Sequence, residues 1–369
     1  MTIIPFIEAR FFDPKEDRFS LEDRFIRYLR NVRRKKMPPE RLVHFEGGDD
    51  VDSSSDAGIL PSISLSDVDE TRIRRRAERI IERRKSTSGL EHLKKEDRAR
   101  LELLKAGVSV ISIPNEHRAD ELAAALHEDM PWMAPATDVV WRAMRRSVQE
   151  GWPGLEIPPL LLNDPPGIGK SRWARRLGEL LSVPTTVIEA TTENASFGLV
   201  GSQRGWGSAF PGRLIETVLQ GRIANPVIVI DEVEKAGQAI STKDHIFGLA
   251  EALLPLLEPL TSEHWSCPYY QVKFNMSYVA WVLTSNTCDL LPAPLLSRCP
   301  PIRLRHLTRA ELTQFVRREG MRRVLSDIAI ETIAEVLAHP SVLGHNPSLR
   351  LAARMLQRAA DFERAPLLH

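Results

Sequence analysis

Residues 160–171 read Leu-Leu-Leu-Asn-Asp-Pro-Pro-Gly-Ile-Gly-Lys-Ser, an apolar run that breaks into a Pro/Gly turn and ends in Gly-Lys-Ser. The pattern predicts a buried strand, a phosphate-binding loop and the start of a helix. The backbone N–H groups of such a loop and the positive end of the helix dipole attract an anion. We therefore expect Lys170 to reach the β- and γ-phosphates of a nucleotide and the Ser171 hydroxyl to ligate Mg²⁺.

The loop fits the pattern G-x-x-x-x-G-K-[ST] except at its first position, where Asp164 replaces glycine. Asp tolerates a positive φ better than most residues, so the turn is still able to form. A carboxylate facing the phosphates at ~6 Å would repel them by roughly 3 kcal/mol per unit charge at an effective dielectric of ~20, so we expect Asp164 to point outward. Taken alone, this stretch leaves a chance Gly-Lys-Ser as the alternative. The expected nucleotide-binding residues are Asp164, Pro165, Pro166, Gly167, Ile168, Gly169, Lys170 and Ser171.

Two later apolar runs also end in polar side chains. Residues 227–230 are branched and apolar and lead into Asp231 and Glu232, 60 residues after the phosphate loop. Asp231 is expected to hold the Mg²⁺ shell, and Glu232 to orient and deprotonate an attacking water. The second run, residues 279–285, is followed by Asn286, which either positions the same water or caps the next turn. Polar groups at the carboxyl ends of strands that alternate with helices favour an α/β parallel sheet.

Length, composition and charge set the class of protein. The chain has 369 residues, enough for two to three domains, with 50 basic and 49 acidic residues and a net charge of +1. The three cysteines show neither metal-ligand spacing nor a disulfide framework, which fits a reducing compartment. Because the N-terminus does not resemble a signal peptide and no run approaches 18 apolar residues, a cytoplasmic protein without a membrane partner is expected.

The expected domains follow from shifts in composition. Residues 1–46 predict a charged helical arm, 47–69 an acidic Ser-rich linker, 70–130 a helical region, 131–306 the α/β nucleotide-binding domain and 307–369 an α-helical lid. In the lid, Thr308 and Glu311 form a predicted capping box.

Basic clusters occur at residues 24–36 and 72–85 in the N-terminal part. They predict either contact with nucleic acid or with an acidic partner, or ordinary solvated helix faces.

The ordered motifs resemble the AAA+ superfamily, and within it the ATPase module of Lon-type proteases. Residues 204–215, RGWGSAFPGRLI, are similar to R-T-Y-[IV]-G-A-M-P-G-R-I-I. Residues 231–235, DEVEK, resemble D-E-I-D-K, and residues 291–298 resemble I-P-x-x-L-L-D-R. Ser348-Leu349-Arg350 stands where the family has G-[VL]-R. The resemblance covers roughly residues 130–362 and implies a P-loop AAA+ sheet flanked by helices and followed by a small all-α lid.

The resemblance also implies roles for single residues. Asp231 and Glu232 become the Walker B pair, and Asn286 becomes sensor 1. Arg298 becomes an arginine finger that reaches a neighbour's nucleotide, and Arg350 becomes sensor 2. The cofactors would be ATP and Mg²⁺. Because the arginine finger acts on a neighbouring subunit, it requires a homo-oligomeric ring, which by resemblance has six subunits. Trp206, followed by Gly207, would form a pore loop that grips polypeptide.

The chain departs from the family in ways that leave alternatives. Gly205 and Gly207 flank Trp206 where the family has Thr and a β-branched residue, and the sequence ends at His369 without a Ser-Lys peptidase domain. The leading expectation is an ATP-driven ring that unfolds or remodels polypeptide, without protease activity of its own and with any peptidase or effector a separate protein. The alternatives are an ATPase that remodels nucleic acid or loads a helicase, and a slowly hydrolysing ATP-gated assembly scaffold.

Overall fold

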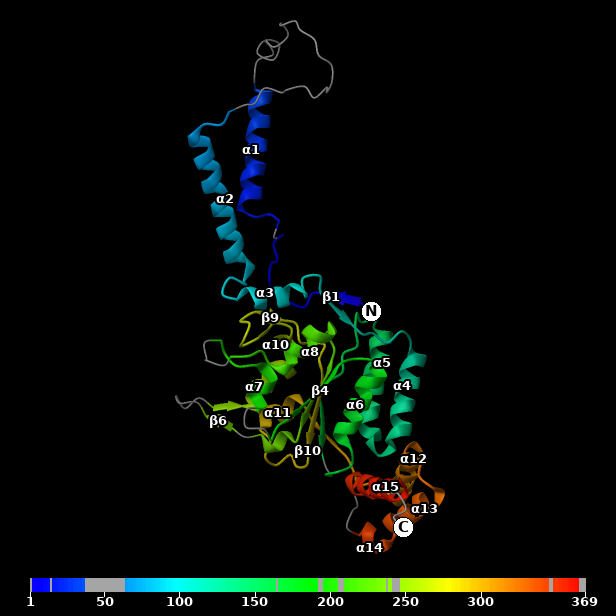
Figure 1. Ribbon diagram of the computed structural model, residues 1–369. Coiled ribbons are helices and arrows are strands. Elements are labelled where there is room, and N and C mark those ends of the chain that lie inside the picture. The colour runs from blue at the N-terminus through cyan, green and yellow to red at the C-terminus, as the bar shows by residue number, and fades with distance from the viewer. Residues whose placement is uncertain are drawn as a thin grey trace, which may run out of the picture. The chain divides into compact units, whose positions relative to one another are not determined.

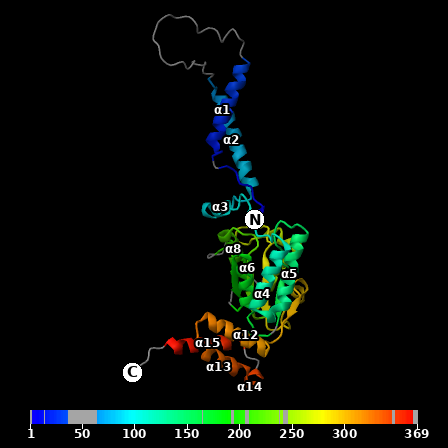
Figure 2. The same cartoon turned by 90° about the vertical axis from the view of Figure 1, so that its right-hand side faces the viewer.

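The computed structural model describes residues 2–13, 15–36, 64–163, 165–191, 195–204, 209–236, 238–240, 246–344 and 348–364. The chain divides into two compact units, one formed by residues 9–98 and the other by residues 1–8 and 99–369 (Figures 1 and 2). This division does not coincide with the domain boundaries expected from composition at residues 46, 69, 130 and 306. Each unit is described separately below.

The unit of residues 9–98 contains two long helices, α1 (Arg18–Lys35) and α2 (Asp67–Ser88), which pack side by side (Figure 1). Ion pairs of 2.7 Å join Arg33 to Asp69 at one end and Arg84 to Glu16 at the other, so the two helices run antiparallel. A capping box of Ser66 and Asp69 starts α2. The last residues of the expected linker, 67–69, are therefore helical, and its residues 47–63 lie outside the described part of the chain.

The first residues of the chain belong to the other unit. β1 (Thr2–Ile4) pairs antiparallel with β2 (Val108–Val110), and Phe6 is fully buried. This differs from the expected helical arm over residues 1–46, because the helix begins only at Arg18. A three-residue strand is too short for the hydrophobic pattern to reveal.

A five-stranded parallel sheet forms the centre of this second unit, with strand order β11-β3-β10-β5-β4. It confirms the predicted α/β parallel sheet. The strands that carry the motifs are buried along almost their whole length, as expected for a sheet covered on both faces. The strands are β3 (Leu160–Asn163), β4 (Thr185–Glu189), β5 (Val227–Asp231), β10 (Ala280–Ser285) and β11 (Pro301–Arg303).

Helices cover both faces of the sheet (Figure 1). On one side α6 packs against β4, β5 and β10, α4 packs on α6, and α5 contacts β11. On the other side α7 contacts β4 and α9, and α9 packs against α11. These helices are α4 (Glu116–Asp129), α5 (Ala134–Gln149), α6 (Lys170–Leu181), α7 (Ala195–Val200), α9 (Leu249–Leu257) and α11 (Ala293–Arg298).

Shorter elements connect the main layers. They are α3 (Lys95–Glu102), η2 (Pro131–Met133), α8 (Arg213–Gly221), η3 (Val233–Lys235), β6 (Gln238–Ile240), β7 (Ile246–Gly248), α10 (Pro259–Ser262), β8 (Trp265–Ser266) and β9 (Lys273–Phe274).

The C-terminal helices follow the sheet as predicted. They are α12 (Arg309–Arg322), α13 (Asp327–Ala338), α14 (Pro340–Leu343) and α15 (Leu349–Arg364). Thr308 and Glu311 form the expected capping box at the start of α12. Phe315, Leu337 and Leu356 of these helices belong to the same buried cluster as the sheet residues Leu160 and Val229. One continuous apolar core therefore joins the lid helices to the sheet.

Candidate functional site

The loop between β3 and α6 has the backbone that phosphate binding requires. Gly167 and Gly169 have φ of +74° and +95°, a region that residues with a side chain rarely adopt. The Ile168 carbonyl accepts a 2.8 Å hydrogen bond from the buried Trp132 indole, and the Gly167 carbonyl accepts one of 2.9 Å from the Leu349 amide. Two elements outside the loop thus fix its carbonyls, while the start of α6 supplies the positive end of a helix dipole. Asp164 lies outside the described residues.

Lys170 is almost fully buried, with 7% of its surface exposed. Its Nζ donates to the Ser285 carbonyl at 2.8 Å, to Asn286 Oδ1 at 3.0 Å and to the Pro165 carbonyl at 3.3 Å. A buried ammonium needs such oxygen partners, because leaving it unpaired costs several kcal/mol. The contacts place Lys170 where the adjacent strands β3 and β10 end.

Ser171 and Asp231 meet at the same edge of the sheet. The Ser171 hydroxyl donates to Asp231 Oδ1 at 2.7 Å, and the buried Thr284 hydroxyl donates to the same oxygen at 2.6 Å. Hydroxyl and carboxylate oxygens are ligands that Mg²⁺ prefers, together with nucleotide phosphates. Among the described residues no group of three or more His, Cys, Asp or Glu side chains is arranged to hold a metal. The pair therefore fits a magnesium ion that a nucleotide helps to bind.

Glu232 follows Asp231 in an unusual backbone conformation, with φ of +55°. Its N–H donates to Thr284 Oγ1 at 3.1 Å, and its carboxylate forms a 2.9 Å ion pair with Lys235. A non-glycine residue in the left-handed region costs about 1 kcal/mol or more, and such residues concentrate at functional sites. The conformation fixes the position of the carboxylate at the end of β5.

Asn286 is held from both sides of its amide group. Oδ1 accepts from Lys170, while Nδ2 donates to Glu234 Oε1 at 2.9 Å and the Asn286 backbone N–H donates to the same oxygen at 3.1 Å. Glu234 therefore determines which way the amide faces. The sequence prediction did not include Glu234 or Thr284, although a polar residue inside an otherwise apolar strand was a signal for Thr284.

The lid also contacts the loop directly. A Cβ atom added at Gly167 would lie 2.6 Å from Ser348 Cβ, closer than side chains tolerate. Leu349 Cδ1 lies 3.1 Å from the same position at Gly169. The two glycines thus allow the N-terminus of α15 to approach the phosphate loop. Arg350 is exposed in the first turn of that helix.

The structure does not join Arg298 to this cluster. Its Nε forms a 3.0 Å ion pair with Glu258, its Nη1 donates to the Pro294 carbonyl at 3.2 Å, and one third of the side chain is exposed. Within the described residues, then, its ionic partner is a carboxylate of the same chain and not a group of the phosphate site.

The predicted pore-loop residues Trp206 and Gly207 lie outside the described residues. The flanking residues are described: the Phe210 amide donates to Ser202 Oγ at 2.9 Å, and the Ser202 amide donates to the Phe210 carbonyl at 3.1 Å. The Arg204 guanidinium lies 5.2 Å from the centre of the Tyr269 ring. Two hydrogen bonds thus join residues 202 and 210.

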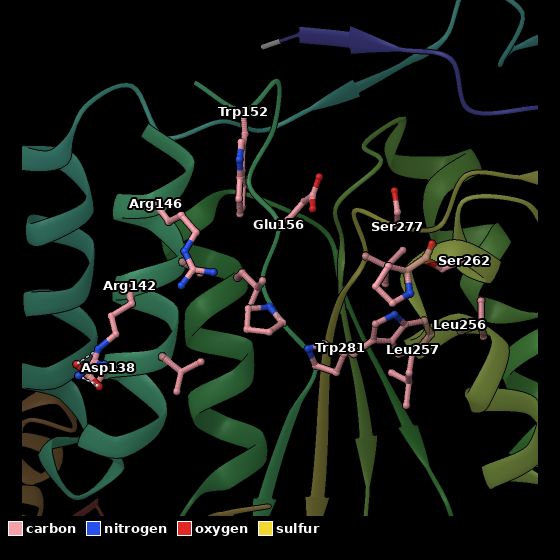
Figure 3. A pocket seen from close by; sticks show the side chains of 17 residues that line it. Asp138, Arg142, Arg146, Trp152, Glu156, Leu256, Leu257, Ser262, Ser277 and Trp281 are labelled. Atoms are coloured by element: carbon pink, nitrogen blue, oxygen red, sulfur yellow. Dashed lines mark hydrogen bonds and ion pairs between the residues drawn. The ribbon is translucent and has the colours of Figure 1, made fainter. Parts of the chain in front are cut away.

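A cavity of about 370 Å³ lies at the other end of the sheet, where β3 and β10 begin. Figure 3 shows that its side chains come from α5, the segment 152–159, the α9–α10 region and the start of β10. Burial raises the pKa of Glu156 at this cavity. None of the predicted nucleotide-binding residues that the structure describes, Pro165 to Ser171, lines it, so it is separate from the phosphate site.

Comparison with known proteins supports the resemblance. The model of the family "ATPase family associated with various cellular activities (AAA)" matches residues 160–307. This range contains the phosphate loop, Asp231, Glu232, Asn286 and Arg298. The match supports an ATPase and confirms the AAA assignment of this part of the chain.

The curated relatives include several Lon proteases. The chain is 29% identical over 210 residues to Lon protease of Metamycoplasma arthritidis, covering 56% of this chain and 24% of the relative. It is 30% identical over 184 residues to Lon protease 2 of Thermus thermophilus, covering 48% and 22%. It is 26% identical over 308 residues to the peroxisomal Lon protease homolog 2 of Arabidopsis thaliana, covering 83% and 34%. The chain thus contains an AAA module related to Lon proteases and spans about a quarter to a third of the length of these relatives.

Proposed function

We propose that this chain binds Mg·ATP between the phosphate loop and the ends of β5 and β10, and hydrolyses it. One observation carries the proposal: two hydrogen bonds, Ser171 Oγ to Asp231 Oδ1 at 2.7 Å and Lys170 Nζ to Asn286 Oδ1 at 3.0 Å, bring together four residues from three strand ends. Carboxyl ends of neighbouring parallel strands are where α/β sheets bind ligands.

The residues fit the chemistry of phosphoryl transfer to water. Lys170 and the amides at the start of α6 would hold the phosphates, and the Ser171 and Asp231 oxygens would hold the magnesium, which neutralises charge on the phosphates. Glu232 is the general base in this proposal, taking a proton from the attacking water, and Asn286 helps to position that water. Glu234 keeps the Asn286 amide oriented.

We further propose that the chain acts as a ring, with Arg298 completing the neighbour's site, and uses ATP hydrolysis to unfold or remodel polypeptide. The similarity to Lon proteases and the hydrogen bonds between Ser202 and Phe210, which flank Trp206 in the sequence, support this proposal. In it six copies of Trp206 would line an axial channel.

The test is phosphate release by the wild type, Lys170→Ala and Glu232→Gln, with and without an unfolded polypeptide such as reduced carboxymethylated lactalbumin. Lys170→Ala should lose nucleotide binding, whereas Glu232→Gln should keep it and lose 10²-fold or more of turnover, because only the base is removed. Polypeptide should stimulate the wild type more than DNA does at two salt concentrations. Wild-type hydrolysis by Glu232→Gln would overturn the catalytic assignment, and stimulation by DNA alone would overturn the polypeptide substrate.

A further inference from the structure

The antiparallel pair α1 and α2 brings together the two basic clusters that the sequence places about 40 residues apart. The seam between the helices buries Leu21, Ile73 and Ala77, so most of the charged side chains face outward. The two helices carry fifteen basic and seven acidic residues, counted over residues 18–35 and 67–88, and so a net charge of +8. The whole chain carries only +1. The basic charge is therefore concentrated on this hairpin.

One flank of α2 carries a row of four arginines. Arg72, Arg76, Arg79 and Arg83 follow one another at i, i+4, i+7 and i+11, which places them in one row along the helix. All four are exposed, and none has a carboxylate partner among the residues that the structure describes. The row extends over about 16 Å at 1.5 Å per residue. We call these four arginines the α2 row.

The opposite flank of α2 has a different character. There Glu78 forms a 2.9 Å ion pair with Arg18 of α1. Arg74 and Lys85 lie on this side, about 160° around the helix from Arg72 and Arg83 at 100° per residue. This flank therefore carries acidic as well as basic groups and gives a natural comparison for the α2 row.

The α2 row continues onto α1. The Arg76 guanidinium lies 5.2 Å from the centre of the Phe25 ring, which places this flank beside the face of α1 next to Phe25. Tyr28 and Lys35 lie near that face, at i and i+7, together with Arg24, which forms a 3.1 Å ion pair with Glu16. Tyr28 is 69% exposed, so an aromatic ring stands among the basic side chains. Basic groups with an interleaved aromatic ring suit a partner that offers phosphates and flat bases.

We propose that this face of the hairpin binds the phosphate backbone of a nucleic acid. Charge complementarity carries the choice, because the row offers guanidinium groups that have no carboxylate partner among the described residues. It extends over about 16 Å, a length that matches about five nucleotides of one duplex strand at 3.4 Å each. Such contacts are independent of base sequence. The surface would place the ATPase on nucleic acid and leaves its polypeptide substrate unchanged, so the proposal goes beyond the proposed function and does not depend on it.

The experiment measures binding of the full chain to a fluorescein-labelled 20-base-pair DNA by fluorescence anisotropy between 50 and 200 mM KCl. The test variant is Arg72→Gln/Arg83→Gln, and the matched control is Arg74→Gln/Lys85→Gln, which removes two charges at the same spacing of eleven residues. The test variant should bind more weakly, and the slope of log K against log salt should fall by about 2, one for each lost phosphate contact. The control variant should keep the wild-type slope within about 0.5.

Both variants should hydrolyse ATP at the wild-type rate and show unchanged helix content by circular dichroism, because the substituted side chains are exposed. Equal weakening by the two variants would mean that net charge and not the α2 row drives binding, and would overturn the proposal. Absence of binding at 50 mM KCl would also overturn it. Polyglutamate of matched charge should compete at least tenfold less well than unlabelled DNA, and equal competition would assign the surface to acidic polypeptide instead.

Discussion

Glu234 is the residue whose contacts most directly constrain the candidate active site. A single oxygen, Oε1, accepts from both the backbone N–H and the side-chain Nδ2 of Asn286, at 3.1 and 2.9 Å. Removing this acceptor should let the Asn286 amide rotate away from the phosphate site. We predict that Glu234→Ala lowers kcat about tenfold while KM for ATP changes less than threefold, because hydrogen bonds to a charged group contribute about 1.5–3 kcal/mol.

Glu234→Gln is the matched control for this prediction. Its amide oxygen is still able to accept both hydrogen bonds, so turnover should stay within threefold of the wild type. Steady-state phosphate release over a range of ATP concentrations gives kcat and KM for ATP separately. An equal loss of kcat in the Ala and Gln variants would show that the charge of Glu234 matters and not its hold on Asn286.

At this scale the sequence was informative where a motif has fixed spacing. Lys170 and Ser171 were predicted because they close the phosphate-loop pattern. Asp231 and Asn286 were predicted because each directly follows an apolar run, and parallel strands bring their carboxyl ends together. Glu234 and Thr284 were missed because their role depends on which oxygen faces which amide across β5 and β10. The Trp132 contact with Ile168 was equally invisible, since 36 residues separate the two and no pattern links them.

The hydrogen bonds at the start of α12 predict how the stability of the lid depends on pH. The Arg305 guanidinium and the backbone and side-chain donors of Thr308 hydrogen-bond the Glu311 carboxylate and lower its pKa to about 2, against burial, which raises it. Because the folded-state pKa is below the unfolded value of 4.5, this stabilisation is complete above pH 4.5 and is lost as the pH falls toward 2. Glu311→Gln should therefore destabilise the lid by about 1 kcal/mol at pH 7 and by less at pH 3.

Urea denaturation followed by circular dichroism at pH 7 and at pH 3 measures this difference. Glu335→Gln, an exposed change in α13, serves as the control and should have little effect at either pH. If Glu311→Gln lowered the free energy of unfolding by the same amount at pH 7 and at pH 3, the Glu311 charge would not act through the capping box.

The contact between the phosphate loop and α15 predicts how a side chain at Gly167 affects ATP binding. Gly167→Ala would place a Cβ 2.6 Å from Ser348 Cβ and would impose a φ of +74° on a residue with a side chain. We expect Gly167→Ala to weaken ATP binding at least tenfold, since the loop and the lid cannot both keep their positions. Gly198→Ala is the control, because a Cβ there meets nothing within 4 Å. Binding of a fluorescent ATP analogue by both variants is the measurement, and equal affinities would contradict the expectation.

Sequence patterns located the long elements well and the short ones poorly. The apolar runs at residues 227–230 and 279–285 agree within a residue with β5 and β10. The pairing of β1 with β2 was not predicted, since strands of three residues carry almost no periodic signal. These short strands form because they pair with residues far away in the sequence.

A substitution at Trp206 tests whether the chain moves polypeptide. The residue lies outside the described part of the chain, between the hydrogen-bonded ends at Ser202 and Phe210. If it grips substrate in a channel, Trp206→Ala should keep the melting temperature, ring assembly and basal ATPase while abolishing ATP-dependent unfolding of a tagged substrate. If it packs in the core, truncation should cost ~3–5 kcal/mol of stability and activity together. Full unfolding activity in a stable Trp206→Ala ring would exclude the pore-loop role.

Assembly itself is tested through Arg298. In a single chain this side chain pairs with Glu258 at 3.0 Å and, within the part of the chain that the structure describes, forms no hydrogen bond or ion pair with the phosphate cluster's Lys170, Ser171, Asp231 or Asn286. A finger acting on a neighbour would leave Glu258 for the neighbour's nucleotide, so Arg298→Ala should lower hydrolysis by ~10³-fold while the subunit stays folded. Glu258→Gln should be far milder, because it removes only the resting partner.

Mixing separates action on a neighbour from action within one chain. Arg298→Ala keeps Glu232, and Glu232→Gln keeps Arg298, so a mixed ring contains interfaces at which both groups are intact. Phosphate release by a mixture in equal amounts should therefore exceed the sum of the two separate variants by tenfold or more once subunits exchange. As a control, mixing Arg298→Ala with Lys170→Ala should recover activity in the same way, because the intact groups again come from different chains. No recovery in rings shown to be mixed by mass spectrometry would mean that Arg298 acts within its own chain.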